Sequence, residues 1–233
     1  MKWRIEHIDE TDSTNQWLKA NGHAEDTVVW TDFQTAGRGQ GTNRWESERH
    51  KNLTFSMLYH PKDMSANSQF VLSMTISLAI CDALEQYIGD VSIKWPNDIY
   101  WRNGKLGGIL IEHQLHGNRI RSSIIGVGLN VNQQVFHSDA PNPVSLWQIS
   151  SRETDREELL HHIIANFDKY KEQPVKDRYM AKLYRRKGFH PYADKEGPFM
   201  AELTDVEDDG HLLLQDETGQ LRRYAFKEVT FIL

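Results

Sequence analysis

Apolar and polar residues alternate over short stretches of this chain, and these stretches predict strands. Residues 27–33, TVVWTDF, are β-branched and aromatic. Residues 52–59, NLTFSMLY, place apolar side chains at 53, 55, 57 and 59 and polar ones at Thr54 and Ser56. A period of two predicts a strand with one buried face. We therefore expect residues 52–59 to form a half-buried strand.

Between residues 91 and 132, short apolar runs are separated by turn dipeptides. Asn103-Gly104 and Gly117-Asn118 stand between such runs, and these pairs are typical of tight hairpins. The segment therefore predicts an antiparallel meander. Its consecutive strands would bring Asn97, Asp98, Lys105 and Asn130 near one another.

Helical patterns appear in two places in the first half of the chain. Asp12-Ser13-Thr14-Asn15 precedes QWLKA and then Asn21-Gly22, which predicts a cap, a short helix and a stop. Residues 70–88 alternate locally, but the segment runs long without Gly or Pro, so its length favours a buried helix.

A further pair of helices is expected after residue 150. Thr154 and Glu157 have the spacing of a capping box, which would open an amphipathic helix that runs to about Tyr170. Pro174 would break this helix, and a second helix would run to Gly188.

The pattern of apolar and polar residues changes after residue 187. Short alternating runs are separated by Asp-Asp-Gly and Glu-Thr-Gly turns, which predicts a small all-β barrel or sandwich. The fold class is therefore α+β. A mixed, largely antiparallel sheet with helices is expected in residues 1–187, and a small β domain in residues 188–233.

Composition narrows the class of protein. A net charge of -6 over 233 residues disfavours a protein that mainly coats nucleic acid. The single cysteine, Cys81, excludes an internal disulfide and a multi-cysteine zinc site, and it favours a reducing compartment. The N-terminus lacks the apolar core of a signal peptide, and polar residues interrupt the most apolar stretch. We expect a cytoplasmic protein that does not span a membrane.

The stretch AGRGQGTNRW, residues 36–45, is the first candidate site. It lacks the spacing of a nucleotide-binding P-loop and of the dinucleotide fingerprint, so it is either a simple connection or an anion-binding loop. Nearby, Asp98 and Lys105 flank a hairpin, and Gly107-Gly108 leave a strand interior without side chains. A hairpin ion pair with packing glycines is the structural alternative.

The histidines do not predict a metal centre. Glu112, His113 and His116 lie in a strand, where positions three apart face opposite sides. The local sequence contains no Ser-His-Asp or Cys-His pattern. The chemistry indicated is positioning and charge stabilisation.

Five motifs in order give the chain a family resemblance. They are STN at residues 13–15, QTAGRGQGTNRW, KWPNDI, KLGGILIE and GVGLNVN. Together they resemble the catalytic core of a biotin protein ligase, also called biotin-[acetyl-CoA-carboxylase] ligase. The resemblance covers residues 8 to about 133, and the β-rich tail is similar to the SH3-like C-terminal domain of that family.

The resemblance implies a class II synthetase-like core and a two-step reaction. Biotin would react with MgATP to give biotinyl-5'-AMP and pyrophosphate, and a lysine of a biotin carboxyl carrier protein would then accept the biotin. Lys105, Arg38 and Asp98 match catalytic positions, with Mg²⁺ near Asp98. The positions that match biotin contacts are Ser13, Thr14, Asn15, Gln34, Arg38, Gly39, Gln40 and Lys105. Those that match adenylate contacts are Trp45, Asn97, Asp98, Lys105 and Asn130.

The chain departs from the family pattern at two places. Gln40 replaces the second arginine of the usual Gly-Arg-Gly-Arg, so we expect the grip on the adenylate to rest on backbone amides and Arg38. The sequence begins shortly before Ser13, so we expect neither an N-terminal winged-helix domain nor DNA binding.

Two alternatives stay open at this point. A lipoate-protein ligase shares the fold and chemistry but carries a different glycine signature, with paired arginines ahead of the glycines. A non-catalytic ligand-binding domain would keep the pocket without turnover, although Lys105 argues against it. The carrier protein, the order of residues 36–45 without ligand and the oligomeric state are open, and a homodimer is one of the arrangements.

Overall fold

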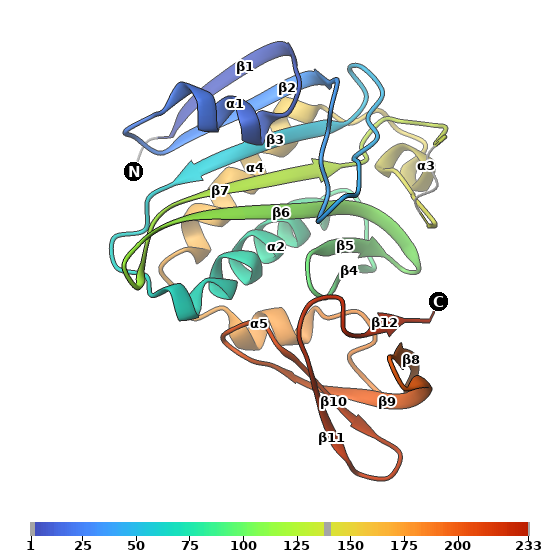
Figure 1. The fold of residues 1–233 in the computed structure, drawn as a ribbon. Helices are drawn as coiled ribbons and strands as arrows, with labels where there is room; N and C mark the ends of the chain where they lie inside the picture. Colours follow the sequence, from blue (N-terminus) through green and yellow to red (C-terminus); the bar gives the residue numbers. More distant parts are fainter. Residues whose placement is uncertain (1–2, 138–140, 233) are drawn as a thin grey trace.

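The main layer of the protein is a seven-stranded sheet (Figure 1). The computed structural model describes residues 3–137 and 141–232. The strand order is β1-β2-β3-β7-β6-β5-β4, in which β1 and β2 are parallel and all other neighbours are antiparallel. The strands are β1 (Arg4–Thr11), β2 (Thr27–Gln34), β3 (Leu53–Tyr59), β4 (Val91–Lys94), β5 (Asp98–Trp101), β6 (Gly104–His116) and β7 (Arg119–Leu129). The expected mixed sheet and its antiparallel meander are confirmed.

Helices cover both faces of this sheet. The longer helices α2 (Phe70–Leu84) and α4 (Arg156–Tyr170) lie together behind it, and α1 (Thr14–Asn21) lies in front of β2, β3 and β7 (Figure 1). The expected buried helix is α2. The stretch Ala66–Leu84 has the length and hydropathy of a membrane span, but 72% of it is buried inside the protein, where it forms the core. Burial also raises the pKa of the Cys81 thiol, as expected for an inert core residue.

The prediction that β3 is half-buried is wrong, because all seven of its residues are buried. Phe55 and Met57 belong to the main core with α2, whereas Leu58 packs with Leu18 of α1 on the opposite face. Ser56 lies on the α1 face, where its Oγ donates to Asn15 Oδ1 at 2.6 Å and lies 2.7 Å from Thr14 Oγ1. Ser56 therefore lines the contact with α1, and Thr54 donates to Thr31 O of β2, so neither polar position faces water.

The predicted capping box at Thr154 is also wrong by one residue. Asp155 is the N-cap of α4, and its carboxylate accepts hydrogen bonds from the backbone N–H groups of Glu157 and Glu158. Thr154 is held outside the helix because its backbone N–H and C=O both bond to the Asn132 side chain. A true capping box opens the short helix α3 (Leu146–Ser150), where Ser145 and Gln148 cap each other.

The helix expected to run to Gly188 ends much earlier, at α5 (Lys176–Ala181). The chain leaves the helix because it pairs with β4, where Ile93 N donates to Lys182 O and Tyr184 N donates to Ile93 O. This pairing with the sheet edge competes with helical hydrogen bonds and leads the chain into the last part of the fold.

The C-terminal residues form a second, five-stranded sheet, as expected. Its order is β11-β10-β9-β8-β12, and it does not close into a barrel within the residues that the structure describes. The strands are β8 (His190–Asp194), β9 (Gly197–Val206), β10 (Leu212–Asp216), β11 (Leu221–Tyr224) and β12 (Thr230–Phe231). All of its neighbouring strands are antiparallel.

The two sheets share one apolar core. Trp95, which follows β4, donates from Nε1 to Gly210 O at 2.9 Å and meets the Phe226 ring at 5.4 Å between centroids. Phe226 also lies 5.8 Å from the Phe70 ring of α2. These contacts hold the C-terminal sheet against the end of the main sheet, and the division at residues 187 and 188 stays a prediction.

A buried ion pair attaches α4 to β2. Arg156 Nη2 lies 2.7 Å from Asp32 Oδ1, and the side chains are 15% and 9% exposed. His7 Nε2 lies 3.1 Å from Asp32 Oδ2. Burial opposes ionisation of Asp32, but the hydrogen bond and charge of Arg156 outweigh it and hold the Asp32 pKa below its ordinary value of 3.8.

Replacement of Asp32 by Asn should lower the free energy of unfolding at pH 7 by about 3 kcal/mol, because Arg156 would keep a buried charge without a carboxylate partner. The stabilisation from a lowered carboxyl pKa is present above pH 3.8 and is lost as the pH falls through the folded-state pKa. Urea unfolding of both proteins from pH 7 to below pH 3.8 checks this. A constant difference at every pH would contradict the assignment.

Candidate functional site

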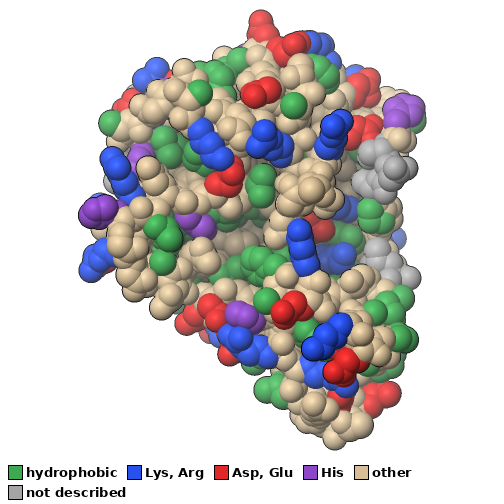
Figure 2. All heavy atoms as spheres, viewed as in Figure 1, with side chains coloured by type: hydrophobic (Ala, Val, Ile, Leu, Met, Phe, Trp, Pro, Cys, Tyr) green, Lys and Arg blue, Asp and Glu red, His purple; other side chains and the backbone are tan. Residues whose placement is uncertain are grey.

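A cavity of about 280 Å³ opens beside the glycine-rich loop, between the main sheet and the C-terminal sheet. Figure 2 shows a hollow between the two parts of the molecule, with Lys and Arg side chains at its rim. Every site residue predicted from the sequence lines it except Asn130. The predicted residues that line it are Ser13, Thr14, Asn15, Gln34, Arg38, Gly39, Gln40, Trp45, Asn97, Asp98 and Lys105.

Two glycines of β7 make room in the cavity for side chains from other elements. A Cβ on Gly128 would lie 2.3 Å from Trp45 Cε2, and a Cβ on Gly126 would lie 2.3 Å from Asn15 Oδ1. Gly128 pairs with Gly108 of β6, so neighbouring strands present bare backbone at this point. The Gly-x-Gly of the GVGLN motif therefore lets Trp45 and Asn15 lie directly on the sheet.

The N-terminus of α1 forms one end of the cavity. Thr14 donates from its backbone N to Gln34 Oε1 at 2.9 Å and from Oγ1 to the same oxygen at 3.2 Å. Ser13 is the N-cap, is 3% exposed and makes no side-chain capping bond. Its hydroxyl therefore stays available to a ligand in the cavity.

Asn15 is held by three neighbours. Ser56 Oγ donates to Asn15 Oδ1 at 2.6 Å, and Asn15 Nδ2 donates to Glu112 Oε2 at 2.9 Å and to Leu110 O at 3.5 Å. Glu112 is partly buried, which opposes its ionisation. Hydrogen bonds from Lys19 and Asn15 outweigh this and lower the Glu112 pKa.

Sequence reasoning considered Glu112 only as a metal ligand and missed this contact. In a strand, Gly108, Leu110 and Glu112 share one face. That period, applied from Gly108 onward, would have placed the carboxylate on the cavity side. His113 turns to the other face, where its ring Nδ1 lies 2.8 Å from Ser123 Oγ.

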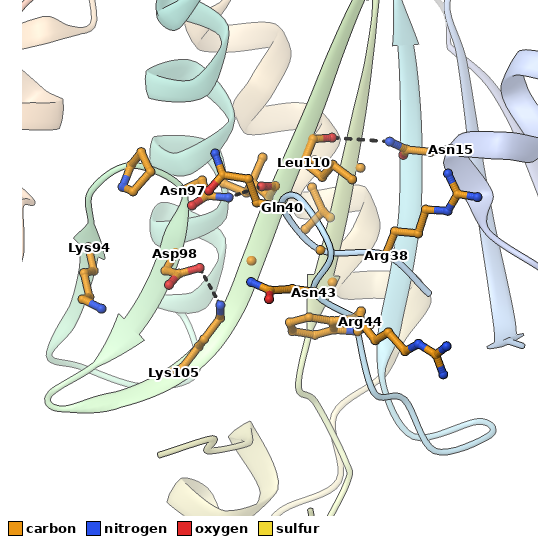
Figure 3. Close-up of a pocket in the computed structure, with 18 of the residues that line it drawn as sticks. Asn15, Arg38, Gln40, Asn43, Arg44, Lys94, Asn97, Asp98, Lys105 and Leu110 are labelled. Carbon is orange, nitrogen blue, oxygen red and sulfur yellow. Dashed lines mark hydrogen bonds and ion pairs between the residues drawn. The ribbon is translucent and has the colours of Figure 1, made fainter. Parts of the chain in front are cut away.

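The charged end of the cavity is formed by β4, β5 and the start of β6 (Figure 3). Lys105 Nζ lies 2.7 Å from Asp98 Oδ1. Lys94 stands opposite Asp98 in the strand pair. Burial lowers the pKa of Lys94, against the opposing effect of the Asp98 carboxylate, and its Nζ lies 5.0 Å from the centroid of the Tyr100 ring. Sequence reasoning did not select Lys94.

The two asparagines predicted as adenylate contacts, Asn97 and Asn130, donate hydrogen bonds to backbone carbonyls. Asn97 Nδ2 donates to Ile109 O at 2.6 Å while the residue lines the cavity. Asn130 is 4% exposed and donates from Nδ2 to Lys105 O at 3.3 Å and to Val144 O at 3.1 Å. The structure therefore places Asn130 behind Lys105, outside the cavity lining, and its adenylate contact stays a prediction.

The loop of residues 36–45 folds back on itself over the cavity. Gly39 N donates to Asn43 O at 2.8 Å, and Trp45 N donates to Gly37 O at 3.0 Å. Figure 3 places Gln40 beside Asn97, while Arg38 and Arg44 extend toward the other side. Trp45 Nε1 is buried without a hydrogen-bond partner among the described residues. Such a donor at a cavity wall is suited to a polar ligand atom.

Part of the wall comes from the C-terminal sheet, which sequence reasoning treated as separate. These residues are Lys227, Val229, Thr230 and Phe231. No local motif marks them, because their position depends on how Trp95 and Phe226 join the two sheets.

The family model and the related sequences that match this chain point to the same family. The family model described as "Biotin/lipoate A/B protein ligase family" matches residues 6–130. A bifunctional ligase/repressor BirA of Bacillus spizizenii is 32% identical over 241 residues, covering 94% of this chain and 70% of the relative. A biotin--[acetyl-CoA-carboxylase] ligase of Paracoccus denitrificans is 28% identical, covering 90% of this chain and 93% of the relative.

A solved structure of a biotin protein ligase is similar to this chain over nearly its whole length. The biotin protein ligase of Aquifex aeolicus, solved in complex with biotin and ATP, has a TM-score of 0.78. It is 27% identical in sequence and covers 97% of each chain. The similarity therefore includes the C-terminal sheet as well as the part matched by the family model.

Substitution of Gly128 by Ala should displace Trp45, because the new Cβ would overlap the indole ring. We expect trypsin to cleave the loop after Arg44 several-fold faster than in the wild-type protein, without any ligand present.

Gly108→Ala is the matched control, since its Cβ would meet Trp45 Cζ3 and Asp98 Oδ1 at an ordinary 3.6 Å. Equal cleavage rates in the two variants would show that the close approach at Gly128 does not position the loop.

Proposed function

The chain belongs to the biotin/lipoate A/B protein ligase family, and from this premise we propose that it is a biotin protein ligase that joins biotin to a carrier lysine at the expense of ATP. The cavity carries this proposal, because residues from five separate motifs line one pocket. The similarity to relatives named as biotin ligases supports biotin as the substrate.

The α1 end of the cavity suits the ureido ring of biotin. That ring offers a carbonyl oxygen and two N–H groups, and the cavity offers the Ser13 hydroxyl and the Gln34 and Asn15 carboxamides. Because Glu112 and Ser56 fix the Asn15 carboxamide, its orientation is set before a ligand enters. This supports the biotin contacts proposed for residues 13–15 and Gln34.

The charged end suits the carboxylate of biotin and the α-phosphate of ATP. In the first step a carboxylate oxygen forms a bond to the α-phosphorus, and the bond from that phosphorus to pyrophosphate breaks. Both reactants are anions, so the ammonium of Lys105 would reduce their repulsion and stabilise charge in the transition state. Arg38 would act on the same oxygens.

The donor set fits a Mg²⁺ ion that arrives with ATP. Mg²⁺ favours one or two carboxylates together with water and phosphate oxygens, and Asp98 offers one carboxylate in the cavity. The ion would neutralise phosphate charge when bound. Before that, the ion pair with Lys105 at 2.7 Å orients the Asp98 carboxylate.

The adenylate would lie beside the Trp45 ring, near the bare backbone of Gly108 and Gly128. The Trp45 ring already occupies part of this surface, and its free Nε1 offers a donor to a polar atom of the nucleotide. The loop of residues 36–45 would close over the intermediate and exclude water from the mixed anhydride. In the second step the amine of the carrier lysine attacks the biotinyl carbonyl, and AMP leaves.

The acceptor protein, the cellular location and the oligomeric state are also proposals. The names of the relatives support a biotin carboxyl carrier protein of acetyl-CoA carboxylase as the acceptor. A cytoplasmic location agrees with the single buried cysteine. A homodimer stays a prediction that light scattering can test.

Pyrophosphate release with biotin or with lipoate as the acid substrate separates the candidate functions. We expect ATP-dependent release with biotin and little with lipoate, followed by a mass shift of a carrier domain by one biotinyl group. Release with lipoate alone would favour a lipoate ligase, and binding of biotin without release would favour a non-catalytic domain.

Lys105→Ala should lower the rate of biotinyl-AMP formation by about a hundredfold or more, because one positioned charge would be lost at the reacting anions. Lys62→Ala is the matched control, since Lys62 is an exposed lysine outside the cavity lining. Thermal unfolding of both variants checks that the fold is intact. Near-normal adenylation in Lys105→Ala would contradict the proposed role.

A further inference from the structure

One lysine in the loop between β11 and β12 lies at the cavity without a partner among the described residues. Lys227 lies between β11 and β12, is exposed and lines the pocket. No hydrogen bond or ion pair joins its ammonium to another residue in the part of the chain that the structure describes. The motifs found in the sequence do not include it.

The backbone at Lys227 is in the left-handed region, with φ of 71°. This region favours glycine, because a Cβ is crowded against the backbone there. Such conformations are retained most often at functional sites. The strain is therefore a second observation that sets Lys227 apart from the other exposed lysines.

The ammonium of Lys227 reaches the glycine-rich loop. A Cβ on Gly41 would lie only 2.6 Å from Lys227 Nζ, so the absence of a side chain at Gly41 leaves room for the ammonium. Gly41 directly follows Gln40, the position where the family pattern has its second arginine. The positive charge of Lys227 therefore lies beside Gln40, the position where the family pattern has an arginine.

The charges that line the cavity are mostly positive. The only carboxylate in the described lining is that of Asp98, and it is paired with Lys105. The cations that line the cavity are Arg38, Arg44, Lys94, Lys105 and Lys227. A lining of this kind suits a ligand with several negative charges, such as a polyphosphate.

We propose that Lys227 binds phosphate oxygens of ATP during biotin activation and so supplies, from the C-terminal sheet, the cation that Gln40 does not provide. This inference rests on the proposed function. Lys227 would act through its charge alone and transfer no proton, and it would attract both the bound polyphosphate and the pyrophosphate that leaves. The carrier-dependent second step involves no polyphosphate and does not need Lys227.

Two variants separate charge from backbone strain. Lys227→Met removes the ammonium and keeps a long side chain, whereas Lys227→Gly removes the ammonium and suits the left-handed backbone. We expect both to raise the KM for ATP about tenfold in pyrophosphate-release assays, with the Kd for biotin unchanged. The Gly variant should melt at the same or a higher temperature than the wild type.

Lys195→Met is the matched control, because Lys195 is an exposed lysine of the same sheet that lies outside the cavity lining. The double variant Gln40→Arg with Lys227→Gly should recover most of the affinity for ATP. Transfer of biotin from preformed biotinyl-AMP to a carrier domain should proceed at the wild-type rate in both single Lys227 variants.

An unchanged KM for ATP in Lys227→Met would overturn the inference, and so would a loss of ATP affinity that Gln40→Arg fails to restore. Both results leave the proposed function standing, because the wild-type protein would still release pyrophosphate with biotin. A wild-type protein that releases none would overturn the proposed function itself.

Discussion

Side chains of other elements can pack flat on a β-sheet only where its strands carry no side chains, and this constraint shapes the cavity. Gly108 of β6 and Gly126 and Gly128 of β7 supply that bare surface. The Asn15 side chain packs on Gly126 and the Trp45 ring packs on Gly128. Both lie so close to the backbone that neither glycine has space for a methyl group. The family's motifs are therefore parts of one packing arrangement.

The same constraint explains why polar groups are buried around the site. A strand that faces α1 on one side and the main core on the other has no surface exposed to water, so Ser56 must find its partners within the protein. Its partners are Thr14 and Asn15, and Asn15 in turn donates a hydrogen bond to Glu112. The same hydrogen bonds therefore satisfy the buried polar groups and orient the Asn15 side chain at the site.

Features decided by neighbours in the sequence could be predicted, and those decided by distant packing could not. The hairpins of residues 91–132 and the buried helix α2 follow from turn dipeptides and from segment length. The burial of β3 depends on α1, the start of α4 depends on Asn132, and the end of α5 depends on pairing with β4. Most of the residues that line the cavity belong to local motifs, whereas Lys227 reaches the cavity only through the contact between two sheets.

The burial of the only cysteine has a practical consequence for experiments on the loop. Cys81 lies inside α2 and its thiol ionises only with difficulty, so reagents that modify thiols will find no native target on the folded protein. A cysteine introduced at Asn43, on the loop that covers the cavity, would then carry a single fluorophore or spin label. The opening and closing of the loop can be followed in solution without first removing a native thiol.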